Sequence, residues 1–286
     1  MRLTALLLAA CGVAVLSAQT SPAPAAMMTQ RSVNIFRRFA ADRAGELEFY
    51  VDVIGVRPLT PLTTPGGGQM SLFAIETSSQ LKLTPVAAGR QEKSGPVLDV
   101  TGLRVYSFFY CSESQIVPRF TSHGYAAPEF HDSHGRRSAM VTDPDGQWVE
   151  LVIASCGDAA PARFEVGATV SDVEKSRAFY RDFVGLKELP PADSQFGRTY
   201  RFALGAESAN ILNLWAGHPG AAADTYTAGI QYVVSDVDAV DARAKANHVT
   251  IATPLGMFGA GLRTIWLGDP DGITNYFAQI LRATPR

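Results

Sequence analysis

The sequence carries little net charge and few long apolar stretches. Its 25 lysines and arginines nearly balance its 27 aspartates and glutamates, which leaves a formal charge of −2. A near-neutral chain has no electrostatic reason to bind nucleic acid or an acidic lipid surface. Beyond about the first twenty residues no apolar run is long enough to cross a bilayer, so no membrane span is expected.

Common catalytic motifs are missing as well. The sequence has no nucleophile elbow and no chain order typical of a Ser-His-Asp triad. Gly66 to Gly68 follow a proline, but no Lys-Ser/Thr pair and helix come after them, so they indicate a turn rather than a phosphate-binding loop. The sequence therefore identifies no catalytic residue by motif.

The N-terminal segment looks like a targeting signal. Arg2 precedes an apolar run over residues 3–16, and cleavage is expected near Ala18. We therefore interpret residues 1–18 as a signal peptide and the Pro/Ala-rich residues 19–31 as a linker.

Cysteine is scarce, with three in the chain. Leu8-Ala9-Ala10-Cys11 resembles a bacterial lipoprotein box, which would leave a lipid anchor at Cys11. Only ten residues precede Cys11 and the apolar run continues past it, which favours a soluble exported protein, periplasmic or secreted. The remaining pair, Cys111 and Cys156, would then lie in an oxidising compartment.

Two motifs occur twice. FYVDVIGVRPL at residues 49–59 matches FYRDFVGLKEL at residues 179–189 in five of eleven positions, 130 residues apart. DPDG occurs at residues 143–146 and 269–272, 126 residues apart. These similar offsets indicate a duplicated chain. The expected domains are residues 32–156 and 162–286.

The DPDG sequence has the chemistry of a tight turn. Its first aspartate can accept backbone N–H bonds, proline presets φ, and glycine accepts a left-handed conformation. We interpret both copies as hairpin turns between the last two strands of a unit, and not as a catalytic site.

Each half is predicted to contain the pattern β-α-β-β(-β) twice. Asp172 is the expected cap of a helix over residues 173–184 that Gly185 ends, and Asp42 and Gly55 bracket its counterpart. The other predicted elements are strands at 70–76, 103–110, 148–153, 200–204, 210–215, 230–234 and 275–280, and helices from Ser114 to Gly124 and from Asp238 to about Asn247.

VSDVEKSRAFYRDFVGL, GIQYVVSDVDAV and the closing DPDG strands resemble the vicinal oxygen chelate superfamily. That family includes glyoxalase I, extradiol dioxygenases and bleomycin-resistance proteins. The resemblance covers nearly all of residues 32–282. It implies an α+β fold of four βαβββ modules, which form two cupped, paired mixed β-sheets that each enclose a pocket, after the N-terminal signal peptide.

The resemblance also implies where metal ligands would stand. In metal-using relatives they come from first strands, usually as histidine, and from a glutamate on a last strand. Glu150 and Glu76 match places for that glutamate. The other positions that carry metal ligands in such relatives are occupied here by Ile35, Val105, Glu165, Gly229 and Tyr276. Because imidazole is absent from this set, no transition metal and no cofactor are expected.

Two histidines have a spacing that could chelate. His131 and His134 nevertheless precede the closing hairpin, away from the expected ligand strands, and a solvated loop is predicted there. The predicted ligand pocket consists of Glu76, Glu150, Glu165, Trp215 and Tyr276. Its carboxylates would suit a cationic or hydrogen-bonding ligand.

Three functions remain open. The chain is predicted to bind a small molecule in a metal-free cup. The alternatives are a metal-dependent lyase, isomerase or dioxygenase acting on vicinal oxygens, and a non-catalytic scaffold subunit whose cups its own side chains fill. The oligomeric state is left open.

A disulfide follows from the resemblance, in which the first and last strands of a module lie parallel and side by side. Cys111 lies six residues past Val105, and Cys156 lies six past Glu150. Equal offsets on neighbouring parallel strands would bring the two sulfurs together. Two buried thiols are the alternative.

Overall fold

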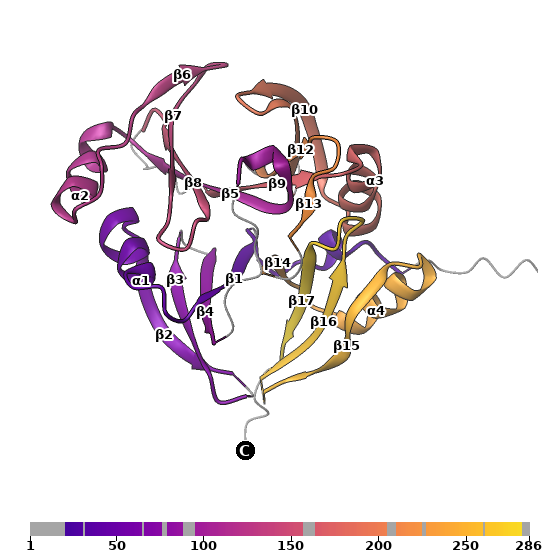
Figure 1. Cartoon of the computed structure of the whole chain (residues 1–286). Coiled ribbons are helices and arrows are strands. Elements are labelled where there is room, and N and C mark those ends of the chain that lie inside the picture. Colours follow the sequence, from indigo (N-terminus) through magenta and orange to yellow (C-terminus); the bar gives the residue numbers. More distant parts are fainter. Residues whose placement is uncertain are drawn as a thin grey trace, which may run out of the picture.

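The computed structural model describes residues 21–30, 32–64, 66–75, 79–87, 95–156, 164–204, 210–224, 227–259 and 261–281. They form two curled mixed sheets with short helices on either side, which is the expected α+β fold (Figure 1). The predicted signal peptide lies outside the described residues. No helix of the described part is long and apolar enough to span a membrane.

One sheet has eight strands in the order β15-β16-β17-β14-β1-β4-β3-β2. We call it the eight-stranded cup. Parallel pairing joins β1 to β4 and β14 to β17, and antiparallel pairing joins β1 to β14. Its strands are β1 (Asn34–Ala40), β2 (Arg57–Thr63), β3 (Gln69–Ala74), β4 (Gln80–Val86), β14 (Ala228–Val233), β15 (Thr250–Phe258), β16 (Leu262–Gly268) and β17 (Thr274–Ile280).

The second sheet, the nine-stranded cup, has the order β10-β11-β12-β9-β5-β8-β7-β6, with β13 paired to β5. Antiparallel pairing of β5 with β9 joins its two modules. Its strands are β5 (Val100–Tyr110), β6 (His131–Ser133), β7 (Arg136–Thr142), β8 (Trp148–Ile153), β9 (Phe164–Val170), β10 (Lys187–Ser194), β11 (Gly197–Ala203), β12 (Asn210–Ala216) and β13 (Ala222–Ala223).

Each cup takes one module from each half of the chain. The first and fourth modules, β1–β4 and β14–β17, make the eight-stranded cup, and the second and third modules make the nine-stranded cup. The repeat in the sequence therefore does not coincide with the sheets, because each module pairs with one from the other half.

Short helices connect the strands. Two lie on one side of the molecule and two on the other, between the cups (Figure 1). They are α1 (Glu46–Glu48), which continues as a π-helix at Phe49–Ile54, α2 (Val117–Ser122), α3 (Val173–Ala178), which continues as a π-helix at Phe179–Val184, and α4 (Val237–Ala246). Single 3-10 turns occur at Pro24–Met27, Val97–Asp99 and Glu113–Gln115.

The predicted cap of the third module is confirmed and two others are corrected. Asp172 accepts a hydrogen bond of 3.1 Å from the Lys175 N–H, and Gly185 ends the helix at φ +87°. The first helix starts at Glu46 rather than after Asp42, because Gly45 turns the chain just before it. In α4 the cap is Asp236, two residues before the predicted Asp238.

Both DPDG copies are turns, as predicted. The Gly146 N–H donates to the Asp143 carbonyl at 3.0 Å, and the Gly272 N–H donates to the Asp269 carbonyl at 2.9 Å. The two glycines have φ of +86° and +80°, a region that glycine occupies without strain. Each turn leads into the closing strand of its module.

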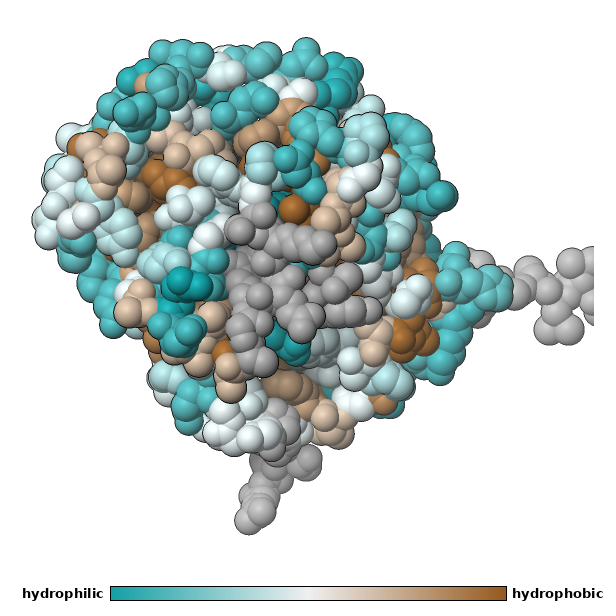
Figure 2. Space-filling view, viewed as in Figure 1, coloured by the Kyte–Doolittle hydropathy of each residue, from teal (hydrophilic) through white to brown (hydrophobic). Residues whose placement is uncertain are grey.

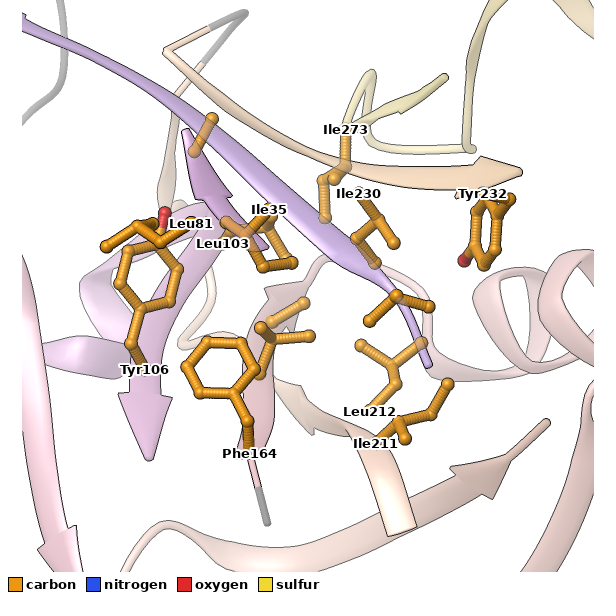
Figure 3. Close-up of a cluster of buried hydrophobic side chains, with 14 of the residues drawn as sticks. Ile35, Leu81, Leu103, Tyr106, Phe164, Ile211, Leu212, Ile230, Tyr232 and Ile273 are labelled. Carbon is orange, nitrogen blue, oxygen red and sulfur yellow. The ribbon is translucent and has the colours of Figure 1, made fainter. Parts of the chain in front are cut away.

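The core lies between the convex faces of the two sheets. Side chains from both sheets point toward one another there, among them Ile35, Leu103, Phe164 and Ile230 (Figure 3). Ile35 is fully buried in this core, so its side chain faces away from the eight-stranded cup. That orientation differs from the cup-facing place that the family resemblance assigned to it.

The expected linker is packed against the second half. The Ser235 N–H donates to the Met27 carbonyl at 2.9 Å, and the Arg243 guanidinium donates to the Ser21 carbonyl at 2.7 Å. Residues 21–30 thus pack along β14 and α4.

Candidate functional site

The nine-stranded cup encloses a cavity of about 180 Å³. Strands from the second and third modules line it, and hydrophilic residues gather at the top of the molecule, above its rim (Figures 1 and 2). Most of the lining is polar. Its inner part comprises Ser138, Glu150, Glu165, Thr199, Asn210 and Asn213, with Arg136 and Trp215.

Two glutamates meet in the cavity because of the strand register. Ser107 of β5 lies opposite Glu150 of β8 and also opposite Glu165 of β9. The Ser107 hydroxyl donates to Glu150 Oε2 at 2.7 Å. The side chains of Glu150 and Glu165 are 9% and 1% exposed, so both carboxylates are largely removed from water.

Arg136 supplies the positive charge between these carboxylates. Its guanidinium donates to Glu150 Oε2 at 2.8 Å and to Glu165 Oε2 at 3.1 Å. The same group lies over the ring of Phe109, 5.1 Å from the centroid. A buried carboxylate is costly unless it is paired, and one guanidinium here serves two of them.

Amide and hydroxyl groups extend this network across the third module. Asn213 Nδ2 donates to Glu165 Oε2 at 3.1 Å, and Asn210 Nδ2 donates to Asn213 Oδ1 at 2.9 Å. The Trp215 indole N–H donates to Thr199 Oγ1 at 2.9 Å. The ring of Trp215 lies where a side chain at Gly167 would stand, so glycine is required there. This network holds the polar lining in fixed positions.

The predicted pocket residues fall into two different cavities. Glu150, Glu165 and Trp215 line the nine-stranded cup, whereas Tyr276 lines the eight-stranded cup. Glu76 lies outside the described residues.

Arg136 was missed by sequence reasoning. It follows the turn at His134 and Gly135 at the start of β7. In the pairing of β7 with β8, Met140 lies opposite Glu150, and Arg136 reaches Glu150 along the sheet through its long side chain. This register could not be read from the sequence.

The two histidines of this hairpin take different positions. His131 belongs to the short strand β6, so the predicted loop is wrong at this residue. His134 has φ +51° in the turn and lines the mouth of the cavity. Its Nδ1 lies 2.8 Å from the Ser133 hydroxyl.

Cys111 and Cys156 are joined by a disulfide, with their Cα atoms 5.3 Å apart. The disulfide prediction placed Val105 opposite Glu150. The observed strand register differs from this by two residues, since Val105 pairs with Trp148 and Glu150 pairs with Ser107. The sulfurs meet because Cys156 lies beyond the end of β8, where the chain is no longer bound to the strand register.

The inner residues of the nine-stranded cup do not fit a transition-metal site. Imidazole, the ligand that such ions prefer, is absent between Glu150 and Glu165, and Arg136 places a positive charge on one oxygen of each carboxylate, where it would repel a metal ion. Within the described ranges no group of three or more His, Cys, Asp and Glu side chains is arranged to hold a metal ion.

The eight-stranded cup holds a second cavity, of about 250 Å³. Tyr276, Trp266 and Phe36 form an aromatic cluster in it, separate from the main core. The ring of Phe36 occupies the space over Gly229, one of the places that the family resemblance assigned to a ligand. This cavity therefore has a different chemistry from the first.

Comparison with known proteins agrees with this architecture. Residues 164–277 match the family model described as Glyoxalase/Bleomycin resistance protein/Dioxygenase superfamily. No curated protein matches the chain.

Solved structures with the same fold include glyoxalase I from Zea mays, at 18% identity and a TM-score of 0.64, covering 88% of this chain and 92% of that one. A single-residue mutant of that enzyme has a TM-score of 0.69 at 18% identity, covering 90% and 94%. A putative dioxygenase from Bacillus subtilis has a TM-score of 0.60 at 17% identity, covering 88% and 86%. At these identities the likeness concerns the fold. Residues 164–277 thus match the glyoxalase/bleomycin resistance/dioxygenase superfamily model, and the chain shares the two-cup fold of glyoxalase I from Zea mays.

Proposed function

We propose that the chain binds a small, polar, uncharged molecule in the nine-stranded cup, without a transition metal. The observation that carries this proposal is the buried trio of Glu150, Arg136 and Glu165 at the wall of a 180 Å³ cavity. Ligand sites are concave and present a few fixed polar groups, and this cavity has both features.

The chemistry of the lining favours an uncharged ligand. Arg136 already neutralises part of the charge of the two glutamates, so a cationic ligand would have to displace it. Asn210, Asn213 and Thr199 offer hydrogen-bond donors and acceptors. Trp215 adds an apolar surface. A molecule with hydroxyl or amide groups and one apolar face would satisfy all of these groups.

The alternatives need features that this cavity does not favour. A metal-dependent reaction would place a metal cation next to the Arg136 guanidinium, which already donates charge-assisted hydrogen bonds to one oxygen of each carboxylate. A scaffold whose cup is filled by its own side chains would not retain an open cavity of 180 Å³. Both considerations support binding.

We also propose that the protein acts outside the cytoplasm. The apolar run at residues 3–16 and the Cys111–Cys156 disulfide support export, because structural disulfides persist in oxidising compartments.

A ligand screen on the chain without residues 1–18 tests the binding proposal. Neutral sugars, polyols, amides and nucleosides are compared by thermal shift, and hits are measured by calorimetry. Asn213→Leu replaces an amide by an apolar group of similar size and is expected to weaken binding about tenfold. Trp266→Phe, in the other cup, is the control and should leave these affinities unchanged. The proposal would be overturned if the compounds found in the screen bind the Asn213→Leu variant as tightly as the wild type but no longer bind the Trp266→Phe variant.

A further inference from the structure

The eight-stranded cup has an aromatic wall. The ring centroids of Phe36 and Trp266 are 5.4 Å apart, and those of Trp266 and Tyr276 are 5.0 Å apart. The ring of Tyr276 stands edge-on to that of Phe36 at 6.5 Å. Three rings from β1, β16 and β17 therefore face one cavity, and aromatic surfaces of this kind bind flat apolar groups.

Two cations lie in the same cavity. Lys82 comes from β4 and Arg38 from β1, and none of the residues that line the cavity in the described part of the chain is an aspartate or glutamate. Lys82 Nζ donates to Gln231 Oε1 across the sheet, and Gln231 is also held by Asn34 Nδ2 at 3.3 Å. An ammonium group has three N–H donors, of which Gln231 accepts one.

Burial affects this lysine directly. Desolvation lowers the pKa of Lys82 to about 8, because burial disfavours its charged form and no carboxylate among the described lining residues compensates the charge. An anion bound beside Lys82 would supply the missing charge. The site thus favours a negative group at the lysine and an apolar group at the rings.

Aliphatic and aromatic side chains complete the lining. Leu62 is 42% exposed, Met70 lies opposite it in the sheet, and Phe258 lines the same cavity. An aromatic cluster can also bind quaternary ammonium ions, but Lys82 and Arg38 would repel them. The charge of the lining therefore discriminates between the two kinds of aromatic ligand.

We propose that the eight-stranded cup is a second binding site, which takes a small aromatic carboxylate. The ring lies against Trp266 and Phe36, and the carboxylate accepts hydrogen bonds from Lys82. A cavity of about 250 Å³ is below the usual range of drug-sized sites, which limits the ligand to one or two rings. This proposal stands independently of the nine-stranded cup, because the two cavities have different lining residues throughout the described part of the chain.

Three probes with one ring system test it by calorimetry: cinnamate, cinnamyl alcohol and cinnamylammonium. Cinnamate is expected to bind most tightly and the ammonium compound least. Lys82→Met should weaken cinnamate binding roughly tenfold to a hundredfold, the usual range for a hydrogen bond to a charged group, and leave cinnamyl alcohol nearly unchanged. Trp266→Ala should weaken all three probes.

A matched control separates charge recognition from loss of structure. Lys175→Met makes the same substitution on α3, where the lysine side chain is 73% exposed, and should leave all affinities unchanged. Lys82→Arg keeps the charge and should keep the preference for cinnamate over the alcohol. The proposal is overturned if cinnamate does not bind, if it binds no better than cinnamyl alcohol, or if Lys175→Met weakens it as much as Lys82→Met.

Discussion

The Tyr180 hydroxyl donates a hydrogen bond of 3.1 Å to the buried carboxylate of Asp269. Its counterpart in the first half, Tyr50, donates to Asp143 at 2.8 Å. The two repeated sequence motifs are therefore partners, since the tyrosine of the FY motif binds the first aspartate of the following DPDG turn. In both halves this contact joins two modules, one from each cup.

The two copies differ in their charge balance. Arg37 contacts Asp143 and also Glu46, the latter at 2.6 Å, and all three side chains are fully buried. No such ion pair is found at Asp269 among the described residues, and burial raises its pKa to about 7. The aspartate of the duplicated contact is thus paired with a buried arginine in one half, whereas among the described residues it has no such partner in the other.

Asp269 should make stability depend on pH. Because its folded pKa of about 7 exceeds its ordinary value of 3.8, the folded state holds a proton that the unfolded state releases. The stabilising effect is complete below about pH 4 and is lost as pH rises through 7, with an upper bound of about 4 kcal/mol. Urea unfolding from pH 4.5 to 7.5 should show the free energy of unfolding falling in the wild type.

The control for this effect is Asp269→Asn, which keeps an oxygen for the Ile273 N–H, places an NH2 group that can donate to the Tyr180 hydroxyl oxygen, and does not titrate. Burial also raises the pKa of Glu46, to about 8, and this contribution is common to both proteins. The difference between the two pH profiles isolates Asp269. Parallel profiles would contradict the assignment.

Arg37 should be among the most costly residues to replace. Arg37→Met leaves Glu46, Asp143 and Asp145 buried without their guanidinium, and breaking such a cluster costs about 3–5 kcal/mol. Arg198→Met removes a 55% exposed guanidinium from a surface pair with Asp193 and should cost less than about 1 kcal/mol. Chemical denaturation of both variants compares them. Equal losses would show that the buried cluster contributes no more than a surface pair.

Local features of the fold could be predicted from the sequence. The DPDG turns and the cap at Asp172 depend on neighbouring residues only, so the chemistry of a few side chains decides them. The helix after Asp42 was misplaced because Gly45, not a polar cap, sets its start.

The chemistry of the cups could be predicted only in part. Glu150 and Glu165 were found through their places on strands, but Arg136 and Lys82 were not. Each becomes part of a cavity only through pairing with a neighbouring strand whose register the sequence does not reveal. The expected strand register was also wrong by two residues. Val105 was expected opposite Glu150, but Ser107 lies there.

The protein should purify without a stoichiometric transition metal. Arg136 donates to one oxygen of Glu150 and one of Glu165, its positive charge would repel a metal ion, and no imidazole lies between the two carboxylates. Elemental analysis of protein made with added iron, nickel or zinc is expected to find far less than one equivalent. Close to one equivalent of metal in the wild type, absent from the Glu150→Gln variant, would refute this prediction. The matched control is Asp193→Asn, at the exposed rim of the cavity.

Anion binding in the eight-stranded cup should weaken at alkaline pH. Lys82 has a pKa of about 8 and loses the charge that attracts cinnamate above it. Among the described residues, the other charged or titratable groups that line the cavity are Arg38 and Tyr276, and burial raises the pKa of Tyr276. Cinnamate should bind about tenfold more weakly at pH 9 than at pH 7, whereas cinnamyl alcohol should not change. A pH-independent cinnamate affinity would remove Lys82 from the site.

The Cys111–Cys156 disulfide should contribute substantially to stability. It links positions 45 residues apart, and in the chain-entropy model closing such a loop stabilises the fold by about 4 kcal/mol. A variant with both Cys111→Ser and Cys156→Ser should lose most of this in urea unfolding, and reduction of the wild type should have the same effect. Mass measurement of unreduced, alkylated protein from an oxidising compartment should find neither cysteine modified. Two alkylated thiols in that material would exclude the bridge, and a double variant as stable as the wild type would show that the loop is already constrained by the pairing of β5 with β8.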